Sequence, residues 1–300
     1  MGEMLKLTSA ARIVVRPGPA IQFGIDATAA GVIDGIEPHH IGAVVGALAS
    51  AKSPVGRTDL AVRLSMAGLN PTAAEQLVGE LLAFGILRSL PTVEPRVALL
   101  GRSSLSALIA ELLTGSGCTV RRPLRGETDG RFLRSLPGEM PLVAVDKLAH
   151  ARVLAGALRG GRRELFVPVQ LVDGRGVIGP LRSGGLGPCP LCTQLHRTDV
   201  DPHWPHLLTQ LPGAASAAPV TVAATAAHAA AMVLAHYGLD RPPLGTTSRR
   251  WQPGLVLDVN PFGELRESVV ASHPHCPLCF ESQNIQQSLP EARCLDRANS

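Results

Sequence analysis

Short apolar segments separated by turn residues predict a small α+β domain over residues 1–90. Two β-prone runs at 11–16 and 20–25 flank Pro17, Gly18 and Pro19, which favour a turn, so these runs predict a β-hairpin. Three helical segments and a returning strand follow, at 38–48, 57–67, 71–84 and 86–88. Thr58 is a candidate cap for the second helix, whereas Asn70 and Pro71 suit the start of the third. This order of elements is typical of a winged-helix-like domain.

From residue 95 onward, apolar runs that fit buried strands alternate with helical segments. A linker at 90–95 leads into a β-α-β unit, with a strand at 96–101, a helix at 103–113 and a strand at 117–120. Further strands are expected at 141–146, 165–170, 176–180, 256–260 and 265–271, and helices at 148–158 and 221–237. The pattern predicts a doubly wound, Rossmann-like α/β domain over 95–280, followed by a flexible tail at 281–300.

The length and apolar content support two domains, and the balance of charges argues against a nucleic-acid partner. The 300 residues are 45% hydrophobic and 17% charged, which is enough apolar content for sizeable cores. The net charge is +4, but residues 1–95 carry seven basic and eight acidic side chains. The predicted third helix carries Glu75 and Glu80 and no basic residue, whereas a DNA-reading helix needs cations to neutralise phosphates. We therefore expect no nucleic-acid partner for this domain.

A peptide suits the first domain better than DNA. An exposed strand edge near the hairpin could accept an extended peptide by strand addition. The alternative is an accessory domain that only packs on its neighbour, because many strand edges bind nothing.

Residues 214–234 are nearly uncharged and long enough to span a bilayer. They consist mostly of Ala, with Pro219, His228 and several hydroxyl residues, so a buried helix fits them better than a membrane span. The N-terminal residues lack the order of a secretory signal. We expect a cytoplasmic protein without a membrane partner.

Two copies of Cys-Pro-Leu-Cys carry the clearest chemistry in the chain. Two residues between paired cysteines let one turn aim both sulfurs at a single point. The copies therefore predict a structural zinc site with four thiolate ligands, Cys189, Cys192, Cys276 and Cys279. A pair of disulfides or a redox Cys-x-x-Cys are the alternatives; disulfides need an oxidising compartment, and a redox pair does not explain the duplication.

The nucleotide-binding signal of the β-α-β unit is weak. Gly101 is the one glycine in its first turn, where Ser103, Ser104 and Ser106 would crowd a phosphate. Asp146 ends a predicted strand, which is where open α/β sheets place their sites. Residues 122–140 are polar and basic, which predicts a solvated loop or, alternatively, a contact for an anion or acidic peptide.

The segment at 195–205 follows the first cysteine pair and is dense in polar and rigid residues. We interpret it as a cap over the zinc site, with Arg197 paired to an Asp and Trp204 packed beneath. The alternative is a surface element that contacts a partner through Arg197, Asp199, Asp201 and Trp204.

The order of these parts resembles the E1-like (ThiF/MoeB-type) superfamily over roughly residues 95–280. The resemblance rests on the β-α-β unit, the strand ending in Asp146, the long helix and the cysteine pairs, the first preceded by Gly179-Pro180 and Gly187-Pro188. The run from Cys189 to Pro205, with its Leu-His-Arg-x-Asp-x-Asp-Pro-x-Trp-Pro end, resembles an actinobacterial branch related to partner proteins of azoline-forming cyclodehydratases. In those systems an N-terminal winged-helix domain holds a leader peptide, and residues 1–90 fit it in length and pattern.

The resemblance implies both a function and a loss of function. Active relatives adenylate a carboxylate with a Gly-rich phosphate loop, an acidic ribose ligand and a magnesium-binding Asp. Gly101 matches the first glycine and Asp146 lies near the place of that Asp, but the rest of the loop and the ribose acid are missing. The resemblance therefore implies a zinc-stabilised homodimeric scaffold that binds a peptide or partner protein, without ATP. The alternative is an ATP-dependent carboxylate-adenylating enzyme with a divergent phosphate loop.

Overall fold

The computed structural model describes residues 2–26, 28–159, 163–211, 213, 215–239, 242–246 and 251–279. The chain forms two compact units, which are described separately. The N-terminal unit comprises Met1–Glu94 and Leu234–Arg250, and the larger unit comprises Pro95–Val233 and Trp251–Ser300. The tail predicted at 281–300 lies outside the described residues.

The N-terminal unit contains two small antiparallel sheets and three helices. In one sheet β1 (Met4–Leu7) pairs with both β5 (Val55–Gly56) and β6 (Leu87–Ser89). The other sheet has the order β2 (Ile13–Arg16), β3 (Ala20–Phe23) and β4 (Gly31–Ile33). The helices are α1 (Ile41–Ser50), α2 (Arg57–Met66) and α3 (Pro71–Ala83). The predicted hairpin, helices and returning strand are all present, whereas β1, β4 and β5 add strands that the sequence did not suggest.

Local chemistry explains where α3 begins and ends. The Asn70 side chain accepts a hydrogen bond from the Thr72 amide at 2.9 Å, as the cap prediction required. Gly85 follows the helix with a φ of 78°, which a side chain disfavours. The expected Thr58 cap is wrong, because α2 starts at Arg57 and Gly56 occupies the cap position.

A segment distant in sequence completes the core of the N-terminal unit. Leu244 is 9% exposed and belongs to the same buried cluster as Leu5, Phe23 and Leu60. The amide of the next residue, Gly245, donates a hydrogen bond to the Phe84 carbonyl at 3.2 Å. The unit is therefore built from two pieces of chain.

The larger unit is built on one mixed sheet of eight strands. The strand order is β14-β13-β11-β10-β9-β7-β8, and β12 pairs with β10. Strands β7 to β10 are parallel, whereas β11 to β14 join antiparallel. The strands are β7 (Arg96–Leu100), β8 (Thr119–Arg121), β9 (Leu142–Val145), β10 (Leu165–Val172), β11 (Arg175–Ile178), β12 (Arg182–Ser183), β13 (Leu255–Val259) and β14 (Arg266–Val269). The predicted Rossmann-like arrangement is present in the parallel half.

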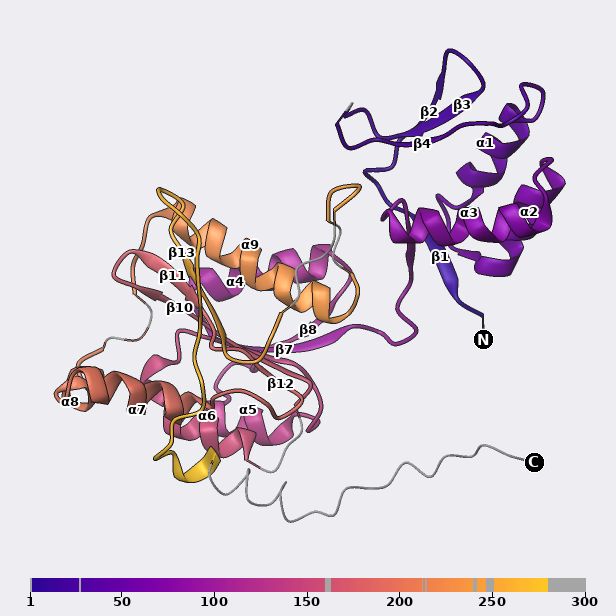
Figure 1. The fold of residues 1–300 in the computed structure, drawn as a ribbon. Coiled ribbons are helices and arrows are strands. Elements are labelled where there is room, and N and C mark those ends of the chain that lie inside the picture. The colour runs from indigo at the N-terminus through magenta and orange to yellow at the C-terminus, as the bar shows by residue number, and fades with distance from the viewer. Residues whose placement is uncertain are drawn as a thin grey trace. The chain divides into compact units, whose positions relative to one another are not determined.

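Helices cover both faces of this sheet. Figure 1 shows α4 and α9 on one face and α5, α6 and α7 on the other. The helices are α4 (Ser104–Gly115), α5 (Asp129–Ser135), the 3-10 turn η1 (Leu148–His150), α6 (Ala151–Leu158), α7 (Pro190–Val200), α8 (Trp204–Leu208) and α9 (Pro219–His236). A Cβ on Gly176 of β11 would lie 1.9 Å from Thr225 Oγ1, so this glycine permits the close approach of α9.

The structure changes the expectation for residues 122–140. The solvated loop expected at 122–140 contains α5, and Phe132 and Leu133 of this helix are buried. Two adjacent apolar residues in a charged stretch are too few to show a helical period. By length and composition α9 could cross a membrane, but core helices of soluble proteins meet the same test, and 39% of it is buried.

Candidate metal centre

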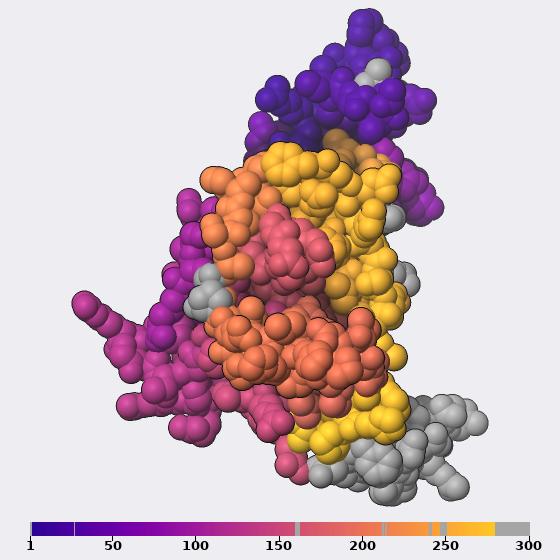
Figure 2. Space-filling model, turned by 90° about the vertical axis from the view of Figure 1, so that its left-hand side faces the viewer, coloured from indigo at the N-terminus to yellow at the C-terminus, as the bar shows by residue number. Residues whose placement is uncertain are grey.

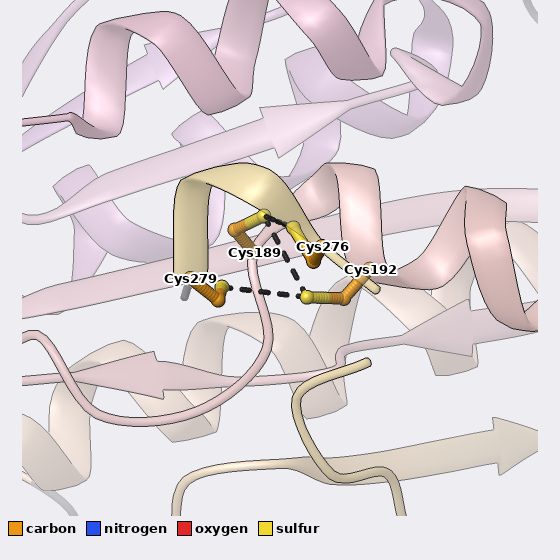
Figure 3. A group of neighbouring side chains, drawn as sticks. All are labelled: Cys189, Cys192, Cys276 and Cys279. Carbon is orange, nitrogen blue, oxygen red and sulfur yellow. Dashed lines mark hydrogen bonds between the residues drawn. The ribbon is translucent and has the colours of Figure 1, made fainter. Parts of the chain in front are cut away.

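The two Cys-Pro-Leu-Cys segments meet in the larger unit. Cys189 immediately precedes α7 and Cys192 lies in its first turn, while Cys276 and Cys279 come from the short segment after β14. Figure 3 shows the four side chains pointing toward one another. All four sulfurs lie within 4.8 Å of each other, and all four residues are buried.

The spacing of the sulfurs fits a tetrahedral metal site. The sulfur–sulfur distances are 3.8 Å for Cys189–Cys192, 3.6 Å for Cys189–Cys276 and 3.4 Å for Cys192–Cys279. Zinc–sulfur bonds of about 2.3 Å at tetrahedral angles place sulfurs about 3.8 Å apart. A disulfide requires about 2.05 Å, and all four cysteines are free. The donor set is therefore suited to zinc and does not form the alternative disulfides.

The electrostatics of the four thiols also call for a cation. Contact with the Cys192 and Cys279 sulfurs, together with burial, raises the pKa of the Cys189 thiol. Four thiolates can share this space only if a metal ion neutralises part of their charge, and metal binding then releases protons. Hydrogen bonds with the Cys189 and Cys192 sulfurs lower the pKa of the Cys279 thiol, and the positive charge of Arg182 adds to this shift. The residues present thus fit a zinc ion, which when bound would crosslink the two segments.

Backbone geometry holds the first cysteine pair in place. Gly187 has a φ of 94°, and a Cβ there would lie 2.6 Å from the Leu181 carbonyl oxygen. Arg182 Nη1 donates a hydrogen bond to the Gly187 carbonyl at 2.8 Å. The backbone that leads into Cys189 is therefore held by contacts of the preceding residues. Ala155, Leu191, Leu195 and Leu278 pack around the cysteines and exclude water.

A second polar cluster, His196, Asp199 and His273, adjoins the cysteines. The ligand atoms of these three residues also lie within 4.8 Å of one another. The His275 amide donates to His273 Nδ1 at 3.1 Å, so the proton of the neutral ring is on Nε2, which donates to Asp199 Oδ2 at 2.8 Å. His196 Nε2 donates to the Ala271 carbonyl at 3.0 Å. These bonds occupy the ring nitrogens of His273, so the cluster is better suited to fixing the second cysteine segment onto α7 than to binding another ion.

The segment from α7 to α8 packs differently from the prediction. Arg197 lies over the Trp204 ring at 4.8 Å, and Trp204 Nε1 donates to the side-chain oxygen of Gln194. The two Asp residues of this segment bond elsewhere, because Asp199 pairs with His273 and Asp201 accepts from the His203 amide. The acidic charge that acts on Arg197 is that of Asp173. Figure 2 shows α7 and α8 as an orange band across one face of the larger unit, beside the yellow residues after 251.

Gly101 and Asp146 lie at the ends of neighbouring strands, and Gly101 serves packing. The strand order changes direction between β7 and β9, and both residues follow these strands. A Cβ on Gly101 would lie 2.9 Å from Val145 Cβ and 3.0 Å from Ser106 Cβ. Arg122 Nη2 reaches Ser106 Oγ at 3.3 Å, so side chains fill the turn where a phosphate loop would leave space.

The surroundings of Asp146 favour its neutral form. Burial raises the pKa of this carboxyl group, although contacts with Ser103 and the Leu171 amide oppose the shift. Asp146 Oδ2 is buried and has no hydrogen-bond partner among the described residues. A magnesium ligand is ionised, so the burial that raises the pKa of Asp146 opposes the role that the resemblance assigned to this residue.

Sequence reasoning did not identify several residues that shape these sites. Gln194, His273 and Arg122 each act through one or two hydrogen bonds to residues far away in the chain. Isolated polar residues of this kind carry no spacing signal. Of these residues, only His273 has a signal in the sequence, because it lies three residues before Cys276 on the same short segment.

Comparison with known proteins gives the fold. No family model and no curated protein matches the chain. Its structure is similar to the heterocyclase TruD, with 14% identity and a TM-score of 0.56 over 95% of this chain and 44% of that chain. A heterocyclase in complex with substrate and cofactor gives 16% identity and a TM-score of 0.54, over 92% of this chain and 39% of that chain.

A third similar structure is E. coli MccB with MccA-N7isoASN, with 13% identity and a TM-score of 0.50 over 92% of this chain and 99% of that chain. The chain thus spans less than half of either heterocyclase chain and nearly the whole length of MccB. At these identities the likeness shows the fold alone. The chain therefore shares the fold of these proteins.

Proposed function

We propose that this protein is a zinc-stabilised, non-catalytic scaffold of E1-like fold that binds a peptide in a peptide-modifying system. The observation that carries the proposal is a groove in the N-terminal unit between β4 and α3. It has a volume of about 490 Å³, and its lining includes Val32, Leu77, Leu81 and Phe84.

The groove combines the two features that an extended peptide needs. Among the described strands, β4 is an edge strand that pairs only with β3, so its other side can offer backbone hydrogen-bonding groups to an added strand. The apolar side chains of α3 lie opposite this edge and can accept alternate side chains of the peptide. Gly31 keeps the edge close to the floor, because a Cβ there would lie 3.0 Å from Ile86 and 3.2 Å from Phe84.

The proposal excludes adenylation activity because of the surroundings of Gly101 and Asp146. Gly101 is packed against Val145 and Ser106, and burial disfavours the ionised form of Asp146. The alternative, a carboxylate-adenylating enzyme, is supported by the position of both residues at the point where the strand order reverses. Pyrophosphate exchange with Mg-ATP separates the two, because exchange that Asp146→Ala abolishes would establish the enzyme.

Selection from a displayed peptide library, followed by fluorescence anisotropy with the selected peptides, tests the groove. Leu77→Glu places a charge in the groove, and we expect it to weaken binding by about tenfold or more, since an unpaired charge opposes apolar burial. Val62→Glu is the matched control, because Val62 is 52% exposed on α2 and outside the groove. Equal affinities for the two variants would refute the groove as the binding site.

The proposal also includes a homodimer in the cytoplasm. Helix α9 leaves Ala223, Ala227 and Ala231 exposed at intervals of four residues, so one of its faces is flat enough for close helix approach. Sedimentation equilibrium of the wild type and of Ala227→Glu tests the dimer. A monomeric wild type would remove this part of the proposal.

A further inference from the structure

A second hollow in the N-terminal unit differs sharply in charge from the peptide groove. It has a volume of about 580 Å³ and lies among β1, the start of β2, the end of α1 and β6. Among the described residues, its lining contains four basic side chains and no acidic one; the basic residues are Lys6, Arg12, Lys52 and Arg88. The groove between β4 and α3 contains Glu80 and no basic residue.

This concentration of charge is local. Residues 1–95 carry seven basic and eight acidic side chains, so more than half of the basic residues of this part line one hollow. Arg12 and Lys52 are exposed and Lys6 is half-buried, so their charged ends remain accessible to a ligand. Thr8, which also lines the hollow, has a buried hydroxyl oxygen without a hydrogen-bond partner among the described residues.

We propose that this hollow binds a short acidic segment of a peptide or protein through its carboxylates. Lysine and arginine supply only donors, three from each ammonium and up to five from each guanidinium, and charge-assisted bonds to carboxylates are among the stronger hydrogen bonds. The site is separate from the β4 groove, so it does not depend on peptide binding there.

The charge around the hollow favours an acidic peptide over nucleic acid. A nucleic acid extends its phosphates well beyond one hollow and needs a broad basic face. The neighbouring helix α3 instead carries Glu75 and Glu80, which would repel such a backbone. A few carboxylates on a short peptide match the size of the cluster.

Fluorescence anisotropy with the full chain and a labelled hexaglutamate peptide tests the proposal, with a hexaglutamine peptide as the neutral comparison. We expect binding of hexaglutamate alone, and a loss of affinity as salt rises from about 50 to 500 mM, because salt screens exposed charges. Arg12→Glu with Lys52→Glu should weaken binding by about tenfold or more, since each substitution replaces a positively charged donor with a negative charge. Arg12→Gln with Lys52→Gln should weaken it less.

Arg16→Glu with Arg63→Glu is the matched control, because it changes the net charge equally at exposed residues outside the hollow. We expect this pair to retain nearly all of the affinity. Equal losses for both pairs would show general charge attraction and overturn the site. Tighter binding of a single-stranded oligonucleotide of the same charge would replace the acidic peptide with a nucleic acid. Leu77→Glu should leave hexaglutamate binding unchanged, so failure of one site is distinguishable from failure of the other.

Discussion

Loss of one cysteine ligand should destabilise the larger unit by several kcal/mol. The perturbation is Cys276→Ser, which removes one sulfur from a cluster that joins residues 87 positions apart in sequence. A crosslink that closes a loop of this length is worth about 4–5 kcal/mol in the chain-entropy treatment. A second estimate is somewhat lower, because about 10–16 kcal/mol of zinc-binding free energy divided among four ligands gives about 2.5–4 kcal/mol each.

Metal analysis and guanidinium unfolding of the purified chain measure this effect. We expect about one zinc ion per wild-type chain, far less in Cys276→Ser, and a lower free energy of unfolding in the variant. Cys118→Ala is the control, because Cys118 is buried and free but outside the cluster, so its zinc content should not change. Wild-type protein that contains no zinc, or Cys276→Ser that keeps both its zinc and its stability, would refute the reasoning.

Three further predictions concern buried polar groups and close packing. Asp146→Asn should raise the melting temperature at about pH 7.5, because the raised pKa of Asp146 in the folded state makes its ionised form unfavourable. The wild type regains stability as pH falls and the carboxylate is protonated. The melting temperatures of the wild type and the variant should therefore converge at low pH. His273→Ala should speed zinc loss to a chelator by about 10–100-fold, whereas Asp199→Asn, which keeps an acceptor for Nε2–H, should have a smaller effect. Gly176→Ala should lower the free energy of unfolding by about 1–3 kcal/mol in urea, and Thr225→Ala should recover part of it, because the new Cβ meets Thr225 Oγ1.

Elements with strong local signals were predictable from the sequence. The strands at β7, β9 and β10 are continuous apolar runs, and α3 has both its Asn70 cap and its Gly85 stop. Elements stabilised mainly by tertiary contacts were not. β1 has only Leu5 and Leu7 facing inward, and β4 has three residues, so neither segment has enough alternation to be recognised.

The candidate site divides in the same way. The duplication of Cys-Pro-Leu-Cys was sufficient to predict that the four sulfurs meet, because two local pairs supply the four ligands of one zinc site. The bond between His273 and Asp199 spans 74 positions and leaves no pattern in the sequence. Gly101 shows a different limit, because a glycine required for packing and a glycine required for phosphate approach are identical in the sequence, and only the positions of Val145 and Ser106 distinguish them.

Leu244 packs among the N-terminal helices and strands, so it determines which fragments of the chain can keep the N-terminal unit intact. A fragment that stops at residue 94 loses this side chain and the Gly245 amide that binds Phe84, so it opens a hole beside the wall of the groove. The fragment would then expose apolar core residues to solvent, and we expect it to fold poorly or aggregate. Ligand-recognition studies of this region therefore require the uncut polypeptide, or a short peptide spanning residues 242–246 supplied in trans.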